Sequence, residues 1–566
     1  MCFVNLIIDR KGYLCANCNS MLEKISEPDC LFEISWEVCN KVTGIYTTLL
    51  SKALTCVEQY DHSNYILIGP WRGNTFPDNV FTEKKTLFKA WRRDIARNGI
   101  TVHAGYWNTP GEPVTLLIDY DEYPQKELLL HKYLPVPEPE NNTAQSTVFG
   151  IIAAMVVESF VAQYIPEGQK IIAHFHETIG GTGALYLRLN CRNILTVYTI
   201  HSSYLSRTIA STGQPFYDEL DTYVDSDVAA QFNVMQEHLL EKTIVRSVHV
   251  LTAISDYAAA ESEQFFGREA DIITPNGFEE NIVPETEALR LKHVKYRKKL
   301  YDMGVQLSPG GEKQVSSLLI GTSGRLEIRN KGFDLFIEVL GRLNESQPEV
   351  PIIAYFFVAP PVERLPESKE SEMDSAEKYV PSEYKADPVY NILFRRFADH
   401  KLLNKPDDDV KIVVLPGYIE KLDNGDKIFS YYDLLSGLDL TVFPSYYEPW
   451  GYRPLESLAF KVPTITTSFS GFGLWIRATS TDYNKGIAVL ERYDDNEEQV
   501  IKGIIKRILE FTLYNDEQFA RVKQQAAYYV KLVLWENLFA NYKQAYSLAL
   551  KSARKENSAT VTENKM

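Results

Sequence analysis

Residues 438–475 read LDLTVFPSYYEPWGYRPLESLAFKVPTITTSFSGFGLW, and the order of elements within them decides the fold. Residues 440–443 are a short apolar run of strand-forming types, and helical spacing of the apolar residues follows Gly451. A second apolar run covers residues 462–467, and the glycines of residues 470–473 predict a turn. Strand, loop, helix and strand in this order are typical of a parallel α/β sheet, in which ligands bind at the carboxyl ends of the strands.

Two carboxylates in this stretch, Glu448 and Glu456, lie eight residues apart. Glu448 is in the loop that leaves the first strand, and Glu456 comes about one turn into the helix. Both side chains are therefore expected to face the same crevice. Carboxylates held in this way can accept hydrogen bonds from the hydroxyl groups of a sugar and of a ribose.

The rest of the chain repeats the alternation of apolar strands and helices. Near-continuous apolar strands separated by helices indicate a parallel sheet that is covered on both faces. One helix is expected near residues 147–164, and its apolar part, residues 148–157, is too short to span a bilayer and fits a buried helix. The expected strands of the first half occupy residues 65–70, 114–120, 170–177, 194–202, 249–255 and 271–277.

Two cations follow an apolar strand in the second half of the chain. Arg325 ends the run SLLIGTSGR, and Lys331 belongs to RNKG, which precedes an amphipathic helix. Arginine offers a planar fork of donors and lysine a mobile point charge, so the two together can neutralise an anionic ligand.

Composition restricts the possible functions. At 566 residues the chain fits two domains of ordinary size, and its formal net charge of −16 excludes a role in binding nucleic acid. An anionic ligand would then require local cations, which Arg325 and Lys331 supply. The odd number of cysteines, seven, and the lack of a secretory leader predict a reducing, cytoplasmic location without a membrane. Cys15 and Cys18 form a CxxC without the second pair of a structural zinc site.

The motifs resemble one enzyme family. EPWGYRPLE is similar to the paired-glutamate motif of retaining nucleotide-sugar glycosyltransferases, and FPSYYEPWGY with TTSFSGFG resembles the glycogen synthase family, as a bacterial-type member. The resemblance implies an α/β fold of GT-B architecture, with two facing Rossmann-like domains, the active site in their cleft and a C-terminal helix crossing back. It also implies transfer of glucose from UDP-glucose to the non-reducing end of glycogen or another α-1,4-glucan, with retention of configuration and without a metal or cofactor.

The same resemblance assigns roles to residues of this sequence. It implies that Arg325 and Lys331 bind the diphosphate, that Glu448 binds the glucose hydroxyls, and that His176, the second histidine of HFHE, lies beside the transferred glucose. These four are the expected catalytic residues. The expected donor-binding residues are Lys41, Gly44, Tyr431, Trp450, Gly451, Tyr452, Glu456, Gly471, Phe472 and Gly473.

Lys41 and Gly44 are expected in a loop before a helix N-terminus, where free N–H groups can bind the donor phosphates. Tyr431 is expected to stack on uracil. The sequence departs from the family pattern in four places: Thr43 replaces a glycine, Thr178 a tryptophan and Arg453 a threonine, and residues 200–203 read IHSS where the family has THAT. Because Arg453 adds positive charge beside the donor, ADP-glucose remains an alternative donor.

The predicted domain organisation has five parts. They are an N-terminal extension at residues 1–30, of which the first twenty would not be native if Met21 is the start, an acceptor-side domain at 31–280, a nucleotide-sugar domain at 281–530, a helix at 531–553 that packs on the first domain, and a disordered tail at 554–566. An irregular insertion at about 360–410 falls where family members form subunit contacts, so a homo-oligomer is expected.

Two other functions stay open. A transferase of the same fold could use a small sugar acceptor, and a protein of another class could bind glucan without catalysis. The C-terminal region from Ile501 onwards lacks the arginine-rich helix through which animal and fungal members sense glucose 6-phosphate, so no activation by this effector is expected.

Overall fold

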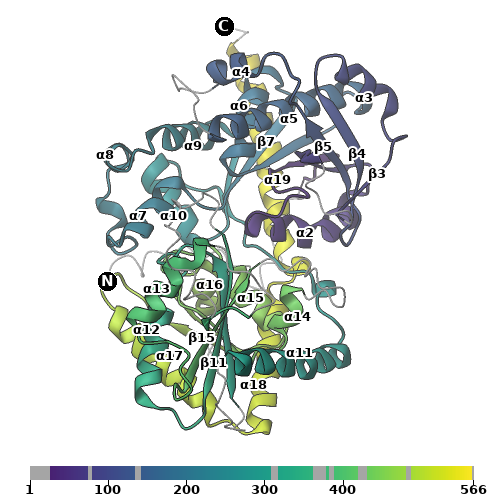
Figure 1. The fold of residues 1–566 in the computed structure, drawn as a ribbon. Helices are drawn as coiled ribbons and strands as arrows, with labels where there is room; N and C mark the ends of the chain where they lie inside the picture. Colours follow the sequence, from purple (N-terminus) through teal and green to yellow (C-terminus); the bar gives the residue numbers. More distant parts are fainter. Residues whose placement is uncertain are drawn as a thin grey trace, which may run out of the picture. The chain divides into compact units, whose positions relative to one another are not determined.

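The computed structural model describes residues 26–73, 80–133, 142–307, 317–360, 378–381, 388–417, 430–479 and 486–563. Two compact units are present (Figure 1). The first comprises residues 1–205, 221–279 and 535–566, and the second comprises residues 206–220 and 280–534. The possible start at Met21 and the cysteine pair at 15 and 18 lie outside the described residues.

The first unit is built on a nine-stranded sheet in the described part of the chain, with the order β3-β4-β5-β2-β1-β6-β7-β8-β9. The strands from β5 to β9 in this order pair in parallel, and β3–β4 and β4–β5 pair antiparallel. The apolar runs predicted from the sequence are buried because both faces of the sheet are covered. The strands are β1 (Cys30–Ile34), β2 (Tyr65–Pro70), β3 (Phe81–Glu83), β4 (Thr101–Trp107), β5 (Val114–Asp119), β6 (Ile171–His176), β7 (Ile194–Ile200), β8 (Val250–Ala253) and β9 (Ile272–Ile273).

Helix α5 is the apolar centre of this unit. Its window Thr147–Tyr164 is long and apolar enough to cross a membrane, with a mean hydropathy of 1.6, but 67% of that window is buried against other elements such as α6. This burial confirms the predicted core helix. The helices of the first unit are α2 (Gly44–Tyr60), α3 (Lys89–Ala96), α4 (Lys126–Tyr133), α5 (Asn142–Tyr164), α6 (Glu177–Asn190), α8 (Asp225–Gln231), α9 (Met235–Ser247), α10 (Asp256–Phe266) and α19 (Trp535–Glu563). The 3-10 helix η2 (Leu220–Thr222) begins at the last residue of a second-unit segment and ends in the first unit.

The second unit contains a six-stranded parallel sheet in the described residues, with the order β12-β11-β10-β13-β14-β15. The strand predicted at residues 440–443 is confirmed, and the strand predicted at 462–467 begins two residues later. The strands are β10 (Leu318–Arg325), β11 (Ile352–Ala359), β12 (Val410–Pro416), β13 (Leu440–Phe443), β14 (Thr464–Thr467) and β15 (Ile487–Leu490).

Residues 471–473 form the first turn of helix α16, and the predicted glycine-bearing turn is therefore wrong at these positions. Ser470 provides the reason, because its Oγ accepts a hydrogen bond from the N–H of Gly473 at 2.9 Å and caps the helix. The helices of the second unit are α11 (Thr286–Gln306), α12 (Phe333–Ser346), α13 (Asn391–Asp399), α14 (Tyr431–Leu435), α15 (Tyr452–Ala459), α16 (Gly471–Thr479), α17 (Glu497–Thr512) and α18 (Asp516–Leu532), with η3 at Glu280–Ile282 and η5 at Pro388–Tyr390. Helix α7 (Tyr204–Thr212) crosses the boundary between the units.

The C-terminal helices differ from the prediction in two ways. The helix predicted at residues 531–553 is interrupted near its start, because α18 ends at Leu532, Val533 is its C-cap and α19 begins at Trp535. The N–H of Trp535 donates to the carbonyl of Phe278 at 3.3 Å. Helix α19 then packs on β7, β8 and β9 of the first unit. The predicted disordered tail is also wrong as far as Glu563, because α19 continues through residues that include neither proline nor glycine.

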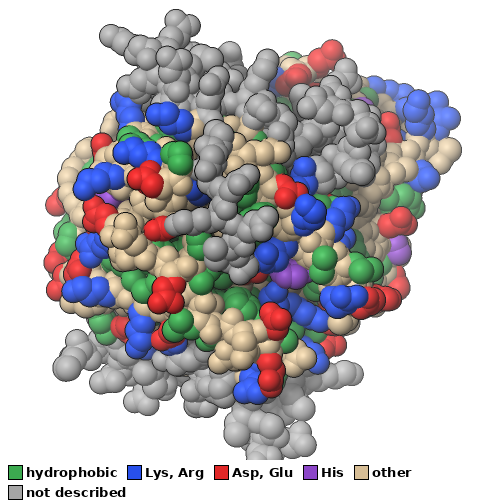
Figure 2. Space-filling view, turned by 60° about the horizontal axis from the view of Figure 1, so that its bottom comes forward, with side chains coloured by type: hydrophobic (Ala, Val, Ile, Leu, Met, Phe, Trp, Pro, Cys, Tyr) green, Lys and Arg blue, Asp and Glu red, His purple; other side chains and the backbone are tan. Residues whose placement is uncertain are grey.

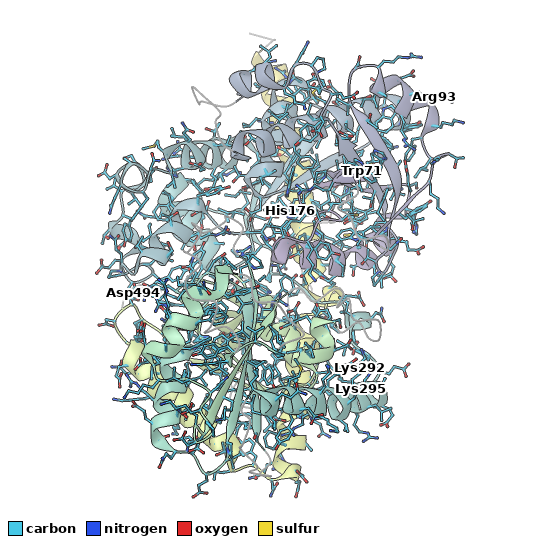
Figure 3. All side chains as sticks on the ribbon, viewed as in Figure 1. Trp71, Arg93, His176, Lys292, Lys295 and Asp494 are labelled. Atoms are coloured by element: carbon cyan, nitrogen blue, oxygen red, sulfur yellow. The ribbon has the colours of Figure 1, made fainter. Side chains whose placement is uncertain are left out.

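Residues 206–220 belong to the second unit, which the sequence did not predict. Asp494, which is labelled in Figure 3, holds this segment. Its Oδ2 accepts the N–H groups of Phe216 at 2.7 Å and Asp218 at 2.9 Å. The hydroxyl of Tyr446 donates to the carbonyl of Gln214 at 3.1 Å. Elsewhere on the surface, acidic and basic side chains are interspersed on the face shown in Figure 2, as the mixed composition predicts.

Candidate active site

Each unit carries a group of charged and polar side chains at the carboxyl ends of its parallel strands. In the second unit these side chains follow β10 and β13, which are neighbours in the sheet. In the first unit they lie on β1, β6 and β7, which are also neighbours. This edge is where open α/β sheets bind ligands.

Arg325 is the last residue of β10, and its guanidinium is held by a carboxylate. The Nε atom donates to Oε1 of Glu327 at 2.8 Å. Burial raises the pKa of Glu327, but the nearby charges of Arg325, Lys331 and Arg207 lower it to about 2. The two predicted diphosphate cations therefore share one ionised acid, which keeps them together when no anion is bound.

Lys331 directly contacts Glu448, the acid among the predicted catalytic residues. Its Nζ donates to Oε2 of Glu448 at 2.6 Å, and both side chains are only partly exposed, at 16% and 21%. The turn that presents Lys331 depends on Gly332, which has a φ of 70°. A Cβ at this position would lie 2.2 Å from the carbonyl oxygen of Pro444, so the close packing of this loop on the end of β13 requires glycine.

The loop after β13 is fixed by backbone pairing with the start of α16. Glu448 forms a parallel bridge with Ser470, and its carbonyl accepts the N–H of Gly471 at 3.0 Å. Gly451 has a φ of 111° and is the N-cap of α15. The N–H groups of Gly471, Phe472 and Gly473 all donate to internal acceptors, so their predicted contacts with the donor stay predictions.

Glu456 is buried within α15 and has two partners. Its Oε1 accepts from the hydroxyl of Tyr432 at 2.9 Å, and its Oε2 accepts from Nη1 of Arg453 at 2.9 Å. The guanidinium of Arg453 also lies 4.4 Å from the ring centroid of Tyr431. Arg453 therefore covers a face of the tyrosine that was expected to stack on uracil.

Tyr431 is held from its other end as well. Its hydroxyl lies 2.9 Å from Oγ of Ser323 on β10, and burial raises the pKa of the phenol to about 12. Trp450, Tyr452 and Phe472, which were expected to bind the donor, are buried, and Trp450 and Phe472 contact each other edge to face. These three side chains support the loop, and their direct contact with a donor stays a prediction.

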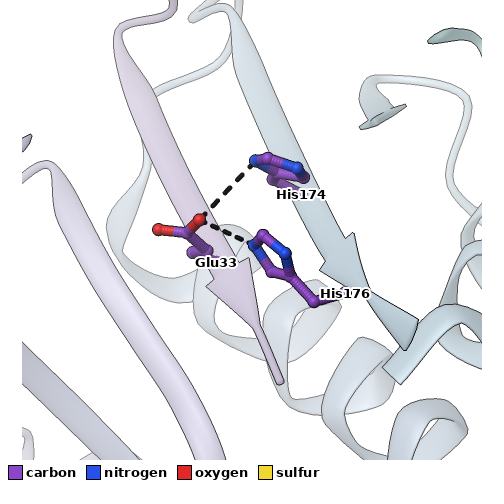
Figure 4. Close-up of side chains that lie close together, drawn as sticks. All are labelled: Glu33, His174 and His176. Carbon is purple, nitrogen blue, oxygen red and sulfur yellow. Dashed lines mark hydrogen bonds and ion pairs between the residues drawn. The ribbon is translucent and has the colours of Figure 1, made fainter. Parts of the chain in front are cut away.

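In the first unit, the imidazole of His176 is fully buried and bonded at both nitrogens. Nε2 lies 2.7 Å from Oε1 of Glu33 on β1 (Figure 4). Nδ1 lies 2.9 Å from Nε2 of His201, which follows β7. The backbone after His176 is constrained too, because Glu177 has a φ of 58°. Both imidazole nitrogens of His176 therefore already have partners within the protein. The expected contact with glucose is then left to the backbone groups of His176.

The expected phosphate loop at Lys41 and Gly44 is followed by helix α2, as predicted, but a carboxylate already lies at the helix N-terminus. Oε2 of Glu37 accepts the N–H of Thr43 at 2.6 Å and that of Tyr46 at 3.0 Å. Thr43 is the N-cap, and its Oγ1 accepts the N–H of Ile45 at 3.2 Å. Thr43 thus adds a capping bond where the family has glycine, and an incoming phosphate would meet the charge of Glu37.

Comparison with known proteins decides the family. The model of the family described as glycogen synthase matches residues 33–364 and 378–566. The chain belongs to the glycogen synthase family. The glycogen [starch] synthase of Caenorhabditis elegans is 28% identical over 596 residues, covering 92% of this chain and 88% of that protein. The liver glycogen [starch] synthase of Homo sapiens is 26% identical over 602 residues, covering 92% of this chain and 84% of that protein.

A solved structure agrees with the expected architecture. The catalytic domain of starch synthase IV from Arabidopsis thaliana, bound to ADP and acarbose, matches with a TM-score of 0.57 at 14% identity, covering 93% of this chain and 100% of that chain. This likeness shows the fold, and the predicted GT-B architecture is confirmed. As a member of the glycogen synthase family with this fold, the chain is a retaining hexosyltransferase.

Several site residues of this family member had no motif to identify them. Glu33 and Lys52 are charged residues within apolar stretches, and Glu327 lies between the two predicted cations. A charged residue inside a predicted buried strand or helix was the available signal, because such a residue requires a partner. Glu37 gave no such signal, since an acid near a loop is ordinary.

Glu33, His174 and His176 are close enough to form a metal site, because their potential ligand atoms lie within 4.8 Å of one another. The residues present do not fit this reading. The ammonium of Lys52 contacts Oε1 of Glu33, and the nitrogens of His174 lie 2.6 Å from Oγ1 of Thr199 and 3.1 Å from the hydroxyl of Tyr546. The positive charge that the carboxylate needs is already supplied by lysine.

Proposed function

We propose that this member of the glycogen synthase family transfers glucose from UDP-glucose to the 4-hydroxyl at the non-reducing end of an α-1,4-glucan, with retention of configuration. The observation that carries the proposal is the pair of contacts between cations and acids at the ends of β10 and β13. Arg325 is bonded to Glu327, and Lys331 is bonded to Glu448. Two cations, each bonded to an acid, suit a reaction in which a diphosphate leaves and a sugar stays.

Donor binding exchanges these partners. A diphosphate offers Arg325 and Lys331 more negative charge than the carboxylates do, so Lys331 moves from Glu448 to a phosphate oxygen. Glu448 is then free to accept hydrogen bonds from glucose hydroxyls. As the bond to the leaving group breaks, the two cations stabilise the developing charge on the nucleoside diphosphate, and the glucose carries developing positive charge near Glu448.

The base of the donor nucleotide binds next to Tyr431 in this proposal. Arg453 lies over this ring and is bonded to Glu456, so the base-binding region carries a cation that the family usually lacks. We expect UDP-glucose to bind by displacing the guanidinium from the ring, with Glu456 turning to the ribose hydroxyls. ADP-glucose is the alternative donor at the same place. A cytoplasmic location and a homo-oligomer remain part of the proposal.

Release of nucleoside diphosphate tests the function. The purified chain is incubated with UDP-glucose or ADP-glucose, and with glycogen, glucose 6-phosphate, fructose 6-phosphate or no acceptor. Release from UDP-glucose that requires glycogen, together with new α-1,4 linkages, supports the proposal. Release that requires a small sugar phosphate would establish the transferase with a small acceptor, and binding of glycogen without release from either donor would establish the non-catalytic protein.

A further inference from the structure

A cavity of about 640 Å³ lies in the first unit, at the edge of the sheet opposite to the carboxyl ends of its parallel strands. Asp29 and Asn64, which line it, directly precede β1 and β2, and Gln169, also in the lining, lies two residues before β6. The volume is within the usual range of small-molecule sites. The cavity is therefore a second place for a ligand, separate from the candidate active site.

The described lining of this cavity contains carboxylates but no cation. Glu27, Asp29 and Asp61 belong to it, and Glu27 is compensated from outside the lining, because Nζ of Lys543 on α19 lies 3.3 Å from its Oε1. Asp29 accepts only the backbone N–H of Lys170, at 2.8 Å. Among the described residues, neither Asp29 nor Asp61 forms an ion pair with a basic side chain. The cavity therefore carries uncompensated negative charge, which disfavours nucleotide sugars and sugar phosphates.

The three carboxylates do not converge on one point. A metal ion requires ligand atoms that surround a single position. Within the described part of the chain, the only group of at least three such side chains with ligand atoms within 4.8 Å of one another is Glu33, His174 and His176, none of which lines this cavity. The negative charge is thus spread along the lining, and it suits an extended ligand with more than one positive group.

Three aromatic side chains form the apolar part of the lining. Phe88, Phe160 and Tyr164 contact one another, with ring centroids 4.9, 5.2 and 4.8 Å apart. Tyr164 is 39% exposed, and no lysine or arginine of the described chain lies over any of the three rings. Aromatic faces attract ammonium groups and pack against methylene chains.

The lining also contains a buried hydroxyl group without a partner. Tyr60 is 5% exposed, and its hydroxyl forms no hydrogen bond with the described residues. Burial raises the pKa of Tyr60, and the nearby charge of Glu27 adds to this effect, so the hydroxyl keeps its hydrogen. A buried polar group that lacks a partner is costly. A ligand in the cavity can supply that partner.

Two lining residues are held in a left-handed backbone conformation. Asp61 is the C-cap of α2 and has a φ of 64°, and Phe88 is the N-cap of α3 and has a φ of 54°. This conformation is strained for residues that carry a Cβ. The fold therefore places one carboxylate and one aromatic ring of the cavity before any ligand is bound.

We propose that this cavity binds a linear polyamine, a ligand in which ammonium groups alternate with methylene chains. Asp29 and Asp61 accept hydrogen bonds from the ammonium groups, the methylene chains pack against Phe88 and Tyr164, and the hydroxyl of Tyr60 accepts a further N–H. The site connects the end of α2, the start of β1 and the end of α5. It does not depend on the proposed transferase function, because it lies away from the candidate active site.

The first test measures binding to the full chain by isothermal titration calorimetry with spermidine. We expect saturable binding of one spermidine per chain. The uncharged 1,8-octanediol, which has a similar length, should not bind, and MgCl₂ at the same concentration of positive charge should not displace spermidine. Lack of saturable binding, displacement by Mg²⁺, or displacement by maltohexaose would overturn the proposal.

The second test removes the charges one at a time. Asp29→Asn and Asp61→Asn should each weaken spermidine binding about fivefold, as expected for one nearby charge in a hydrated site. Asparagine tolerates the left-handed conformation of residue 61. The control is Asp399→Asn, at an exposed position on α13 in the second unit, which should keep the wild-type affinity. Because the net charge is −16, equal losses in all three variants would show diffuse attraction and overturn the site.

The third test locates the bound polyamine. Spermidine should slow amide hydrogen exchange in residues 59–64 and 160–169, at the ends of α2 and α5. Tyr164→Leu should weaken binding several-fold, whereas Tyr528→Leu, at a tyrosine of α18 that is 59% exposed, should not. Protection confined to other segments, or an unchanged affinity in Tyr164→Leu, would contradict binding in this cavity.

Discussion

Nζ of Lys331 lies 2.6 Å from Oε2 of Glu448, so the cation proposed to hold the leaving diphosphate is bonded to the acid proposed to hold the sugar. Neither side chain can serve the donor while this contact persists. The contact links departure of the nucleotide to release of Glu448, and it makes the two residues energetically dependent on each other.

The first prediction concerns this dependence. Lys331→Ala and Glu448→Gln should each lower kcat by about a hundredfold, as loss of one preorganised charged group does in other enzymes. The double variant should lose much less than the product of the two, because each single variant leaves its former partner misplaced. Steady-state kinetics with UDP-glucose and glycogen measures this. Strictly multiplicative losses would mean that the two side chains act independently.

The second prediction concerns Glu327, which shares the charge of Arg325 and Lys331. Glu327→Gln keeps the side-chain volume and removes a negative charge next to the diphosphate. We expect UDP to inhibit this variant at about five- to tenfold lower concentration, in line with about 1 kcal/mol for a partly screened charge. The exposed Glu287→Gln on α11 serves as the control. Unchanged or weaker inhibition by UDP would show that Glu327 does not oppose anion binding.

The third prediction follows from the pKa of Glu327, about 2 in the folded protein. Since this pKa is below the value of about 4.5 in the unfolded chain, ionised Glu327 stabilises the fold above about pH 5 by about 3 kcal/mol, and the contribution is lost as the pH falls through about 2. The melting temperature of Glu327→Gln should therefore be lower than wild type near neutral pH. The two melting curves should converge in acid, and a constant difference at every pH would disprove the assignment.

The fourth prediction concerns Arg453, whose guanidinium covers Tyr431. Arg453→Thr exposes the ring face for base stacking, so the KM for UDP-glucose should fall several-fold, in keeping with about 1 kcal/mol for a stacked aromatic contact. Arg453→Lys, which keeps the charge without the planar group, should lie between the two. A rise in KM for both UDP-glucose and ADP-glucose would identify Arg453 itself as a ligand of the donor.

The fifth prediction is that glucose 6-phosphate does not activate the enzyme. A phosphate effector requires several cations on one surface. The basic residues of α17 and α18 are instead dispersed, and Lys502, Arg507 and Arg521 each pair with a nearby glutamate. Activity at low UDP-glucose is measured while glucose 6-phosphate is added. Saturable activation of several-fold would reveal an effector site that these helices do not suggest.

The sequence alone was sufficient to predict the elements that are determined by short local patterns of residues. Apolar runs such as residues 440–443 became buried parallel strands, and the spacing of Arg325 and Lys331 brought both cations to one acid. Contacts that depend on tertiary structure were not readable. Glu33 and Lys52 are nineteen residues apart, and the segment 206–220 is held by Asp494 from far along the chain.

Predictions from local sequence patterns were also wrong where tertiary packing determines the structure. Nothing in the periodicity around Val533 marks the end of α18, because the break is set by the passage of the chain from one unit to the other. The backbone N–H groups of Gly471 and Phe472 looked available for a ligand, but their acceptors come from the loop of Glu448 and Trp450. Whether a backbone group is free depends on the partner segment, which a motif does not describe.

The two units are completed in an unexpected order during synthesis. The first unit begins the chain but needs α19, which lies after residue 534, whereas every residue of the second unit has been made by then. The buried surface of β7, β8 and β9 therefore stays uncovered on the ribosome until the last residues emerge. The unit that starts the polypeptide is the last to finish folding, and a ribosome that stops before Trp535 would release a chain whose first unit has an open core.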